Sequence, residues 1–400
     1  MNQATDSIAL AECKSSPFDD GCAICMLRLW GSSDPGNPRV WRLAVGVVLV
    51  GWLPLFVLAL VPLAGGNDEV LRAFLRDASV HARSRVAAPI FVLAEGVCGP
   101  RLAALARTFR ERGIILQGRD SAYDEVVRSI SRLRDLWPVH VLAVVLAYVI
   151  AILLFAYVPA SFLPDWHHSQ QILLLGRSLA SWWHALVSLP LLLILLLGWC
   201  WRLVLWARYL WLVSRMDLRL VASHPEGAAG LMFLSHSLSD LSVLGAAIGV
   251  IVASTELAHL FAGGAVTLEQ LGRVTFGTIV FVLLIFVAPL LSFSDVLART
   301  RLLGVSTYGA LAQRVGEAME DKWMRGRAGA DTSDPLSSTD FSVVSDLFQS
   351  AQRASTMRLM PIESGSLLVL TGATALPFGA VALTLVPFSK LLEGLIHLFL

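Results

Sequence analysis

The chain has 400 residues, of which 56% are apolar and only 15% are charged, and its formal net charge is +1. Average soluble domains are roughly 45–50% apolar and about 25% charged, so this composition is typical of a membrane protein. A net charge so close to zero predicts no nucleic-acid partner. The five cysteines are scattered along the chain and do not form the spacing pattern of a disulfide framework.

Residues 1–39 are polar, and we interpret them as an N-terminal tail. They contain no apolar h-region before a small-residue cleavage site, so we expect no cleaved signal peptide. The tail carries Cys13, Cys22 and Cys25 in the pattern C-x8-C-x2-C. One CxxC pair is weak evidence for zinc binding or redox chemistry, and we expect free thiols and no cofactor.

Apolar blocks dominate the rest of the chain. A helix needs about 20 apolar residues to cross ~30 Å of hydrocarbon. Block 366–388 is long enough to span but contains Pro377 and Pro387, which predict a kinked span or a re-entrant hairpin. Residues 390–400 predict a short amphipathic helix at the interface. The blocks that meet the length requirement without such breaks are 41–64, 139–163, 184–205, 241–262 and 274–294.

Block 86–99 is harder to interpret because it is short and contains Pro89 and Glu95. It is either a thin span or a helix packed against the bundle. Glu95 either pairs with an arginine of a neighbouring helix or is the reason that the block is not a true span. The predicted fold is therefore an all-α polytopic transmembrane bundle of six or seven spans. The bundle covers residues 40–295, and a C-terminal transmembrane and interfacial segment covers 365–400.

Lysine and arginine mark the cytoplasmic side of such proteins. Segments 101–137 and 296–364 each hold eight basic residues, whereas 164–183 and 263–273 hold one each. We therefore predict that 101–137 is a cytoplasmic loop, that 296–364 is a cytoplasmic helical segment, and that the C-terminus is external. The charges near the first span slightly favour a cytoplasmic N-terminus, which requires seven crossings.

Segment 101–135 is predicted to be helical, with arginines at helical spacing beside acidic residues. Such a face is either solvated or in contact with anionic lipid headgroups. The predicted partners are the lipid bilayer and a cytoplasmic protein.

The string HPEGAAGL at 224–231 is the most distinctive motif. Pro225 and Glu226 suit a helix N-terminus, where negative charge is favoured. The functional hypothesis joins His224 and Glu226 with His236 and Asp240 farther along that helix, on one face. The alternative is a structural elbow in which these residues cap and pack.

A second constellation lies near the predicted external side. Glu256 and His259 are one helical turn apart, and His167, His168 and His184 lie on the same side. Carboxylate and imidazole groups that converge can bind a metal or relay protons. The alternative is that these groups are ordinary polar side chains at the interface.

Several nucleotide and hydrolase motifs are missing. The chain has no Walker A string, no GxSxG, no HExxH and no GxGxxG after a strand. ATP hydrolysis and the common kinds of hydrolase chemistry are therefore disfavoured.

Several strings together resemble a family of uncharacterised bacterial multi-pass inner-membrane proteins, and the similarity extends over nearly the whole chain. Relatives tend to have HPD and paired glycines where this chain has HPE and AAGLMF, which weakens a catalytic role for Glu226. The resemblance implies a bacterial inner-membrane location, and it carries no activity, substrate or cofactor. The strings are FLRDASVHARSRVAAPIFVLAE (74–95), WARYLWLVSRMDLRL (206–220), HPEGAAGLMFL (224–234), YGALAQRV with the later DKW (308–323), DPLSSTDFSVVSDL (334–347) and LPFGAVALTLVPFSKLLEGL (376–395).

Three functions remain open from the sequence. The first is a transport or channel-like protein whose pathway is lined by His236, Asp240 and Glu256. The second is a non-catalytic scaffold or signalling component that binds partners through its cytoplasmic loops. The third is an intramembrane enzyme that uses His224 and Glu226.

Overall fold

The structure is a computed structural model that describes residues 38–65, 68–157, 166, 178–264, 266–323 and 339–385. Across these ranges it is helical and contains no strand, only an isolated bridge between Ile115 and Leu218. The all-α prediction is confirmed. Seven helices are long and apolar enough to cross a membrane: Val40–Leu63, Ala78–Glu111, Trp137–Tyr157, Leu179–Ser214, Met232–Phe261, Leu268–Asp321 and Ser364–Leu385.

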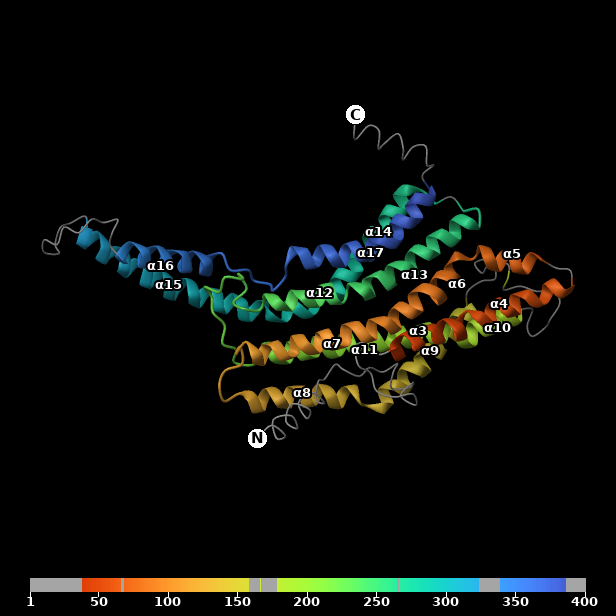
Figure 1. The fold of residues 1–400 in the computed structure, drawn as a ribbon, viewed down its shortest axis with the longest axis horizontal. Coiled ribbons are helices and arrows are strands. Elements are labelled where there is room, and N and C mark those ends of the chain that lie inside the picture. The colour runs from red at the N-terminus through yellow and green to blue at the C-terminus, as the bar shows by residue number, and fades with distance from the viewer. Residues whose placement is uncertain are drawn as a thin grey trace, which may run out of the picture.

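The predicted blocks account for all seven helices, and block 86–99 lies inside the second, Ala78–Glu111. Figure 1 shows them lying side by side along the long dimension of the molecule. In chain order the elements are α3 (Pro38–Gly51), α4 (Leu53–Leu60), η2 (Val61–Gly65), α5 (Glu69–Arg76), α6 (Ala78–Ala82), η3 (Arg83–Ala87), α7 (Ala88–Glu111), α8 (Asp120–Arg134), α9 (Trp137–Tyr157), α10 (Leu179–Trp183), η6 (His184–Ser188), α11 (Leu189–Ser214), η7 (Met232–Ser235), α12 (His236–Asp240), α13 (Ser242–Phe261), α14 (Leu268–Val287), η8 (Ala288–Phe293), α15 (Ser294–Trp323), α16 (Thr339–Ser355) and α17 (Ser364–Leu385).

The two ends of the bundle differ in charge. One end carries the last turns of α7 and α11 together with α8 and α15, and we call it the Arg-rich end; α5 and α6 lie at the opposite end (Figure 1). The first span runs away from the Arg-rich end. Val40, near its start, packs on Gly96 in the middle of the helical run Ala78–Glu111, and α4 follows towards the opposite end (Figure 1). A Cβ on Gly96 would lie only 3.2 Å from a Val40 methyl group, so the small residue permits this close packing.

Helix α13 packs closely against α17 through two glycines four residues apart. A Cβ at Gly249 would lie 2.3 Å from the carbonyl oxygen of Thr374, and a Cβ at Gly245 would lie 2.6 Å from the Thr374 hydroxyl. Small residues at this spacing let membrane helices approach backbone to backbone. The G-A-A-I-G sequence therefore fixes α17 in the bundle. Pro377 lies inside α17, which runs as one helix and not as a re-entrant hairpin, while Pro387 and residues 390–400 lie outside the described residues.

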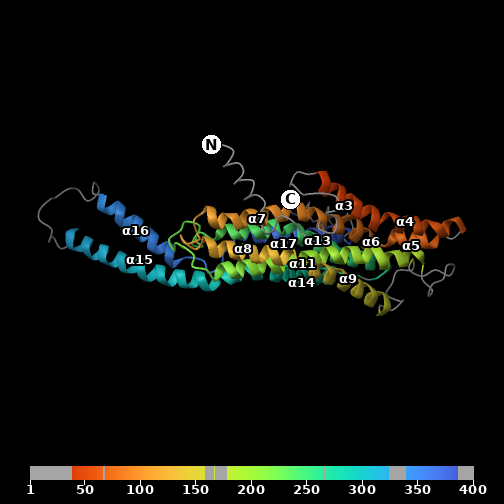
Figure 2. The same cartoon turned by 90° about the horizontal axis from the view of Figure 1, so that it is seen from below.

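The sixth span continues far beyond a bilayer. Residues Leu268–Asp321 form one helical run of 54 residues, which is about 80 Å at 1.5 Å per residue. Helix α16 folds back on α15, and the pair projects past the Arg-rich end as an arm (Figures 1 and 2). The arm is anchored where Gly304 meets Ala222 and Ala354, since a Cβ there would lie 2.3 Å and 3.5 Å from theirs. The sequence predicted a span at 274–294 and a separate cytoplasmic helical segment, but it did not predict that one helical run joins the two.

Aromatic side chains pack α8 onto the ends of α7 and α11 at the Arg-rich end. The Tyr123 hydroxyl of α8 donates to the Ala106 carbonyl of α7 at 2.6 Å and lies 2.7 Å from the Tyr209 hydroxyl of α11. Burial raises the pKa of Tyr123, because the phenolate is costly to desolvate. Phe109, on α7, packs edge-on against Tyr209. The predicted helix at 101–135 is thus the end of α7 followed, after a turn, by α8 packed on α7 and α11.

Candidate functional site

The HPEGAAG motif forms turns and does not begin a helix. Residues 222–231 are irregular, with Gly227, Ala229 and Gly230 at φ of 73°, 53° and 91°. The prediction that Pro225 and Glu226 start a helix is therefore wrong. The reason is that positive φ values break the helical path, and the next helical residues are Met232–Ser235. Ala229 is buried in a conformation that glycine adopts more readily.

His224 and Glu226 do lie together, and both are half-buried. The backbone N–H of Glu226 donates to His224 Nδ1 at 3.3 Å, and the Arg112 guanidinium donates to Glu226 Oε1 at 2.9 Å. The N–H of Arg358 also donates to the Gly227 carbonyl at 2.8 Å. The motif therefore joins three distant segments, which is what the structural-elbow alternative describes.

His236 and Asp240 lie on α12, and they have different surroundings. Asp240 accepts from Arg101 at 2.9 Å, and its carbonyl accepts from the Cys98 thiol at 3.0 Å. His236 is exposed. These two residues share one helix, as predicted, but that helix does not include His224 and Glu226.

Glu256 and His259 lie near the other end of α13, and the structure does not join them to His236 and Asp240. His259 is exposed, while Glu256 is half-buried and its Oε2 atom is buried without a hydrogen-bond partner. His167 and His168 lie outside the described residues. Among the residues that the structure describes, no group of three His, Cys, Asp or Glu side chains is placed to hold a metal.

Two neighbouring spans each contain a π-helical turn, η3 and η6, at the opposite end of the bundle. A π turn inserts one extra residue into a helix and often occurs at functional sites. Residues of both turns line one cavity of about 10 Å³, roughly the size of a water molecule. Its polar lining comes from Arg83 and Ser84 on η3 and from His184 and Ser188 on η6.

Arg83 is the charged centre of this site. Its guanidinium donates to the Thr255 hydroxyl of α13 at 3.4 Å, and its Nε atom is buried without a hydrogen-bond partner. Asp77 supplies the opposite charge within electrostatic reach of Arg83. The Asp77 carboxylate is held by the backbone N–H groups of Ser79 and Val80, at 3.1 and 3.2 Å, as the N-cap of α6.

Aromatic residues enclose the same groups. The Trp166 indole N–H donates to Asp77 Oδ2 at 2.9 Å, and its ring packs edge-on against His184 with centroids 5.9 Å apart. His81 accepts from the Trp52 indole at Nδ1, at 2.8 Å, and its Nε2 lies 3.0 Å from the Phe74 carbonyl. That arrangement fits a neutral imidazole with the proton on Nε2. We call Asp77, Arg83, Trp166, His184 and Thr255 the Arg83 cluster.

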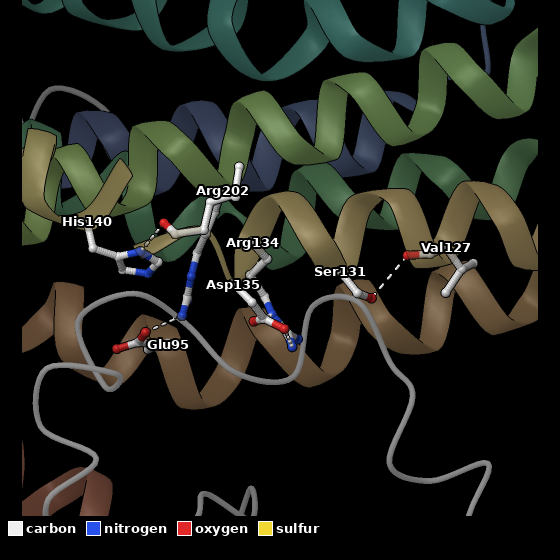
Figure 3. A network of polar contacts seen from close by, with 8 residues as sticks. Glu95, Val127, Ser131, Arg134, Asp135, His140 and Arg202 are labelled. Carbon is white, nitrogen blue, oxygen red and sulfur yellow. Dashed lines mark hydrogen bonds and ion pairs between the residues drawn. The ribbon is translucent and has the colours of Figure 1, made fainter. Parts of the chain in front are cut away.

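A second polar pair lies deeper in the same two spans. Glu95 of α7 and Arg202 of α11 form an ion pair, and their side chains are only 4% and 12% exposed (Figure 3). The Arg202 guanidinium also lies 4.7 Å from the Trp199 ring centroid. The prediction that Glu95 pairs with an arginine of a neighbouring helix is confirmed. Figure 3 also shows the end of α8 nearby, where Arg134 pairs with Asp135 at 2.9 Å.

Sequence reasoning singled out His184 but missed Arg83 and Asp77. Both lie in the polar stretch before block 86–99, which looked like a connection between helices. The structure extends that block backwards to Ala78, so Arg83 lies within the helix. The usable signal was an arginine within one or two turns of an apolar block, where burial demands a partner.

Comparison of the chain with protein-family models, curated proteins and solved structures finds no match.

Proposed function

We propose that this integral membrane protein is a transporter or channel-like protein that moves a small ion. The Arg83 cluster, at the end of the bundle opposite the Arg-rich end, would be its ion-binding site. The observation that carries the proposal is the pair of π turns that face one cavity with Arg83 and His184 in its lining. Charged groups inside membrane spans are costly and are kept where they serve an ion or proton path.

The Glu95–Arg202 pair supports a path along the same two helices. Arg83 and Glu95 are 12 residues apart on one helical run, which is about 18 Å. Apolar residues fill the level between them, with Phe91, Val92 and Ala94 buried. The helical runs Ala78–Glu111 and Leu179–Ser214 thus supply polar groups at two depths separated by an apolar layer.

We further propose a bacterial inner-membrane location with the Arg-rich end in the cytoplasm. The family resemblance supports the location, and the distribution of lysine and arginine supports the orientation. Seven crossings, with the first span running away from the Arg-rich end (Figure 1), favour a cytoplasmic N-terminus and an external end of α17. A membrane-impermeant thiol reagent applied to intact cells tests this with Gly118→Cys and Gly263→Cys in a cysteine-free background. We expect Gly263→Cys to be labelled and Gly118→Cys to be protected.

The transport proposal is tested with purified protein in liposomes. Proton and chloride fluxes are measured for the natural chain, Arg83→Gln and His184→Gln. We expect at least a ten-fold loss of one flux in both variants. Arg273→Gln is the matched control, because Arg273 is 72% exposed at the same end. No flux in the natural chain, or equal flux in all four proteins, rejects the proposal.

A second function rests on the arm formed by α15 and α16. Leu302 and Leu303 are 71% and 67% exposed on α15, and Val343 is 60% exposed on α16, all beyond the spanning part of the bundle. Exposed apolar side chains outside a membrane favour a protein partner, as a scaffold or signalling component requires. Leu302→Ser with Leu303→Ser should abolish capture of a specific cellular protein by the full chain. Unchanged capture contradicts this role.

A further inference from the structure

A groove at the Arg-rich end is lined on one side by α8 and on the other by α11. Its volume is about 370 Å³, and it opens to solvent. The five α8 residues of the lining lie at helical spacing on one face, and Arg208 lines the groove from α11. The lining residues are Glu125, Arg128, Ser129, Arg132, Leu133 and Arg208.

Some arginines of this end are already paired with a carboxylate, whereas the groove arginines have no such partner among the described residues. Arg101, Arg112 and Arg119 each form an ion pair with a carboxylate, at 2.9, 2.9 and 2.7 Å. Within the part of the chain that the structure describes, Arg132 and Arg208 form no ion pair, and the Nε of Arg128 donates to the Asp124 carbonyl at 3.2 Å. Glu125 is the one carboxylate in the lining, so three cations face one anion.

The groove lies close to the membrane surface. Arg132 precedes Trp137, which opens the third span, by five residues, and Arg208 follows Trp201 by seven. The second separation is about 10 Å along α11, and the first spans the short turn between the end of α8 and the start of α9. Tryptophan rings sit at headgroup level, so the guanidinium groups of long arginine side chains reach the headgroup phosphates from these positions.

We propose that this groove binds the phosphate of an anionic phospholipid, with Arg128, Arg132 and Arg208 as its ligands. Arginine suits this chemistry because its planar fork of N–H groups matches phosphate oxygens. Ser129 adds a hydroxyl to the polar lining, and Leu133 adds an apolar surface on the side of α8 nearest the membrane. The site does not depend on ion transport by the Arg83 cluster.

Native mass spectrometry of the full chain in detergent tests the proposal, with phosphatidylglycerol and phosphatidylcholine of identical acyl chains as probes. We expect the natural chain to bind phosphatidylglycerol at least ten-fold more tightly. Each basic residue near an anionic headgroup contributes roughly five-fold in affinity, so Arg132→Gln with Arg208→Gln should lose about 25-fold. The matched control is Arg107→Gln with Arg314→Gln, which removes the same charge from exposed positions outside the groove and should change binding little.

Glu125→Gln supplies a test that a folding defect cannot mimic. Removing the carboxylate found among the described lining residues should tighten phosphatidylglycerol binding by about five-fold. Equal binding in the natural chain, the double variant and Glu125→Gln overturns the proposal. So does binding of inorganic phosphate in place of lipid with the same dependence on Arg132 and Arg208, because the ligand would then be a soluble phosphate.

Discussion

Ion pairs between a carboxylate and an arginine occur in two very different settings in this molecule. Glu95 and Arg202 join two spans inside the bundle, with side chains 4% and 12% exposed. Arg119 and Asp217 join the α7–α8 connection to the segment after α11 at 2.7 Å, with side chains 56% and 65% exposed. In water the attraction between two charges is weak and screened, whereas inside the bundle each charge has lost its hydration. The buried pair therefore stabilises the packing of its two helices only while both charges are present, because either charge alone would be buried without a counterion.

The largest expected effect comes from removing one partner of the inner pair. Glu95→Ala leaves the Arg202 charge buried without its counterion and should lower the free energy of unfolding by about 3–5 kcal/mol. Thermal unfolding in detergent, or steric trapping in bicelles, measures the change. Glu95→Leu with Arg202→Leu is the control, because replacing both charges with apolar groups should cost far less than the single change. A single variant as stable as the natural chain contradicts this account.

A smaller effect is expected where a neutral donor holds a buried carboxylate. Trp166→Phe removes the indole N–H from Asp77 Oδ2 and should destabilise the chain by about 1–3 kcal/mol. Trp211→Phe is the matched comparison, since Trp211 is 48% exposed and contacts only the Arg215 guanidinium at 4.8 Å among the ring contacts described. That variant should cost less than about 1 kcal/mol. Equal losses in the two variants would show that the Asp77 bond contributes little.

The exposed pair should have the smallest effect. Arg119→Gln is expected to change the free energy of unfolding by no more than about 1 kcal/mol, and added salt should reduce even that difference. The same unfolding measurement at low and high ionic strength checks both statements. A loss as large as that of Glu95→Ala would mean that surroundings do not control the strength of these pairs.

Hydropathy predicted the spans well because each apolar block is long and its surroundings are uniform. It left open whether block 86–99 crosses the membrane, and pairing with an arginine was one of two explanations for Glu95, since a buried carboxylate needs a cation. It did not reveal that the helix of block 86–99 begins at Ala78, because the first turns contain His81, Arg83 and Arg85. Those polar groups are compensated by residues distant in sequence, such as Thr255.

The candidate site was harder to predict for a related reason. A π turn needs only one inserted residue, which does not alter the average hydropathy of a span. The turn at HPEGAAG is fixed partly by the bond from Arg358 to Gly227, which joins segments 131 residues apart. Local sequence at Pro225 and Glu226 is compatible with a helix start, and tertiary contacts select the turn instead.

The sixth span leads into α15 through the 3-10 turn η8 without an intervening loop, so the arm is attached directly to the membrane part. Helix α15 is 30 residues long, or about 45 Å. A tilt of α15 by about 5° about η8 would displace its far tip by about 4 Å. The arm therefore acts as a lever that converts small rearrangements among the spans into displacements large enough for a bound protein to sense.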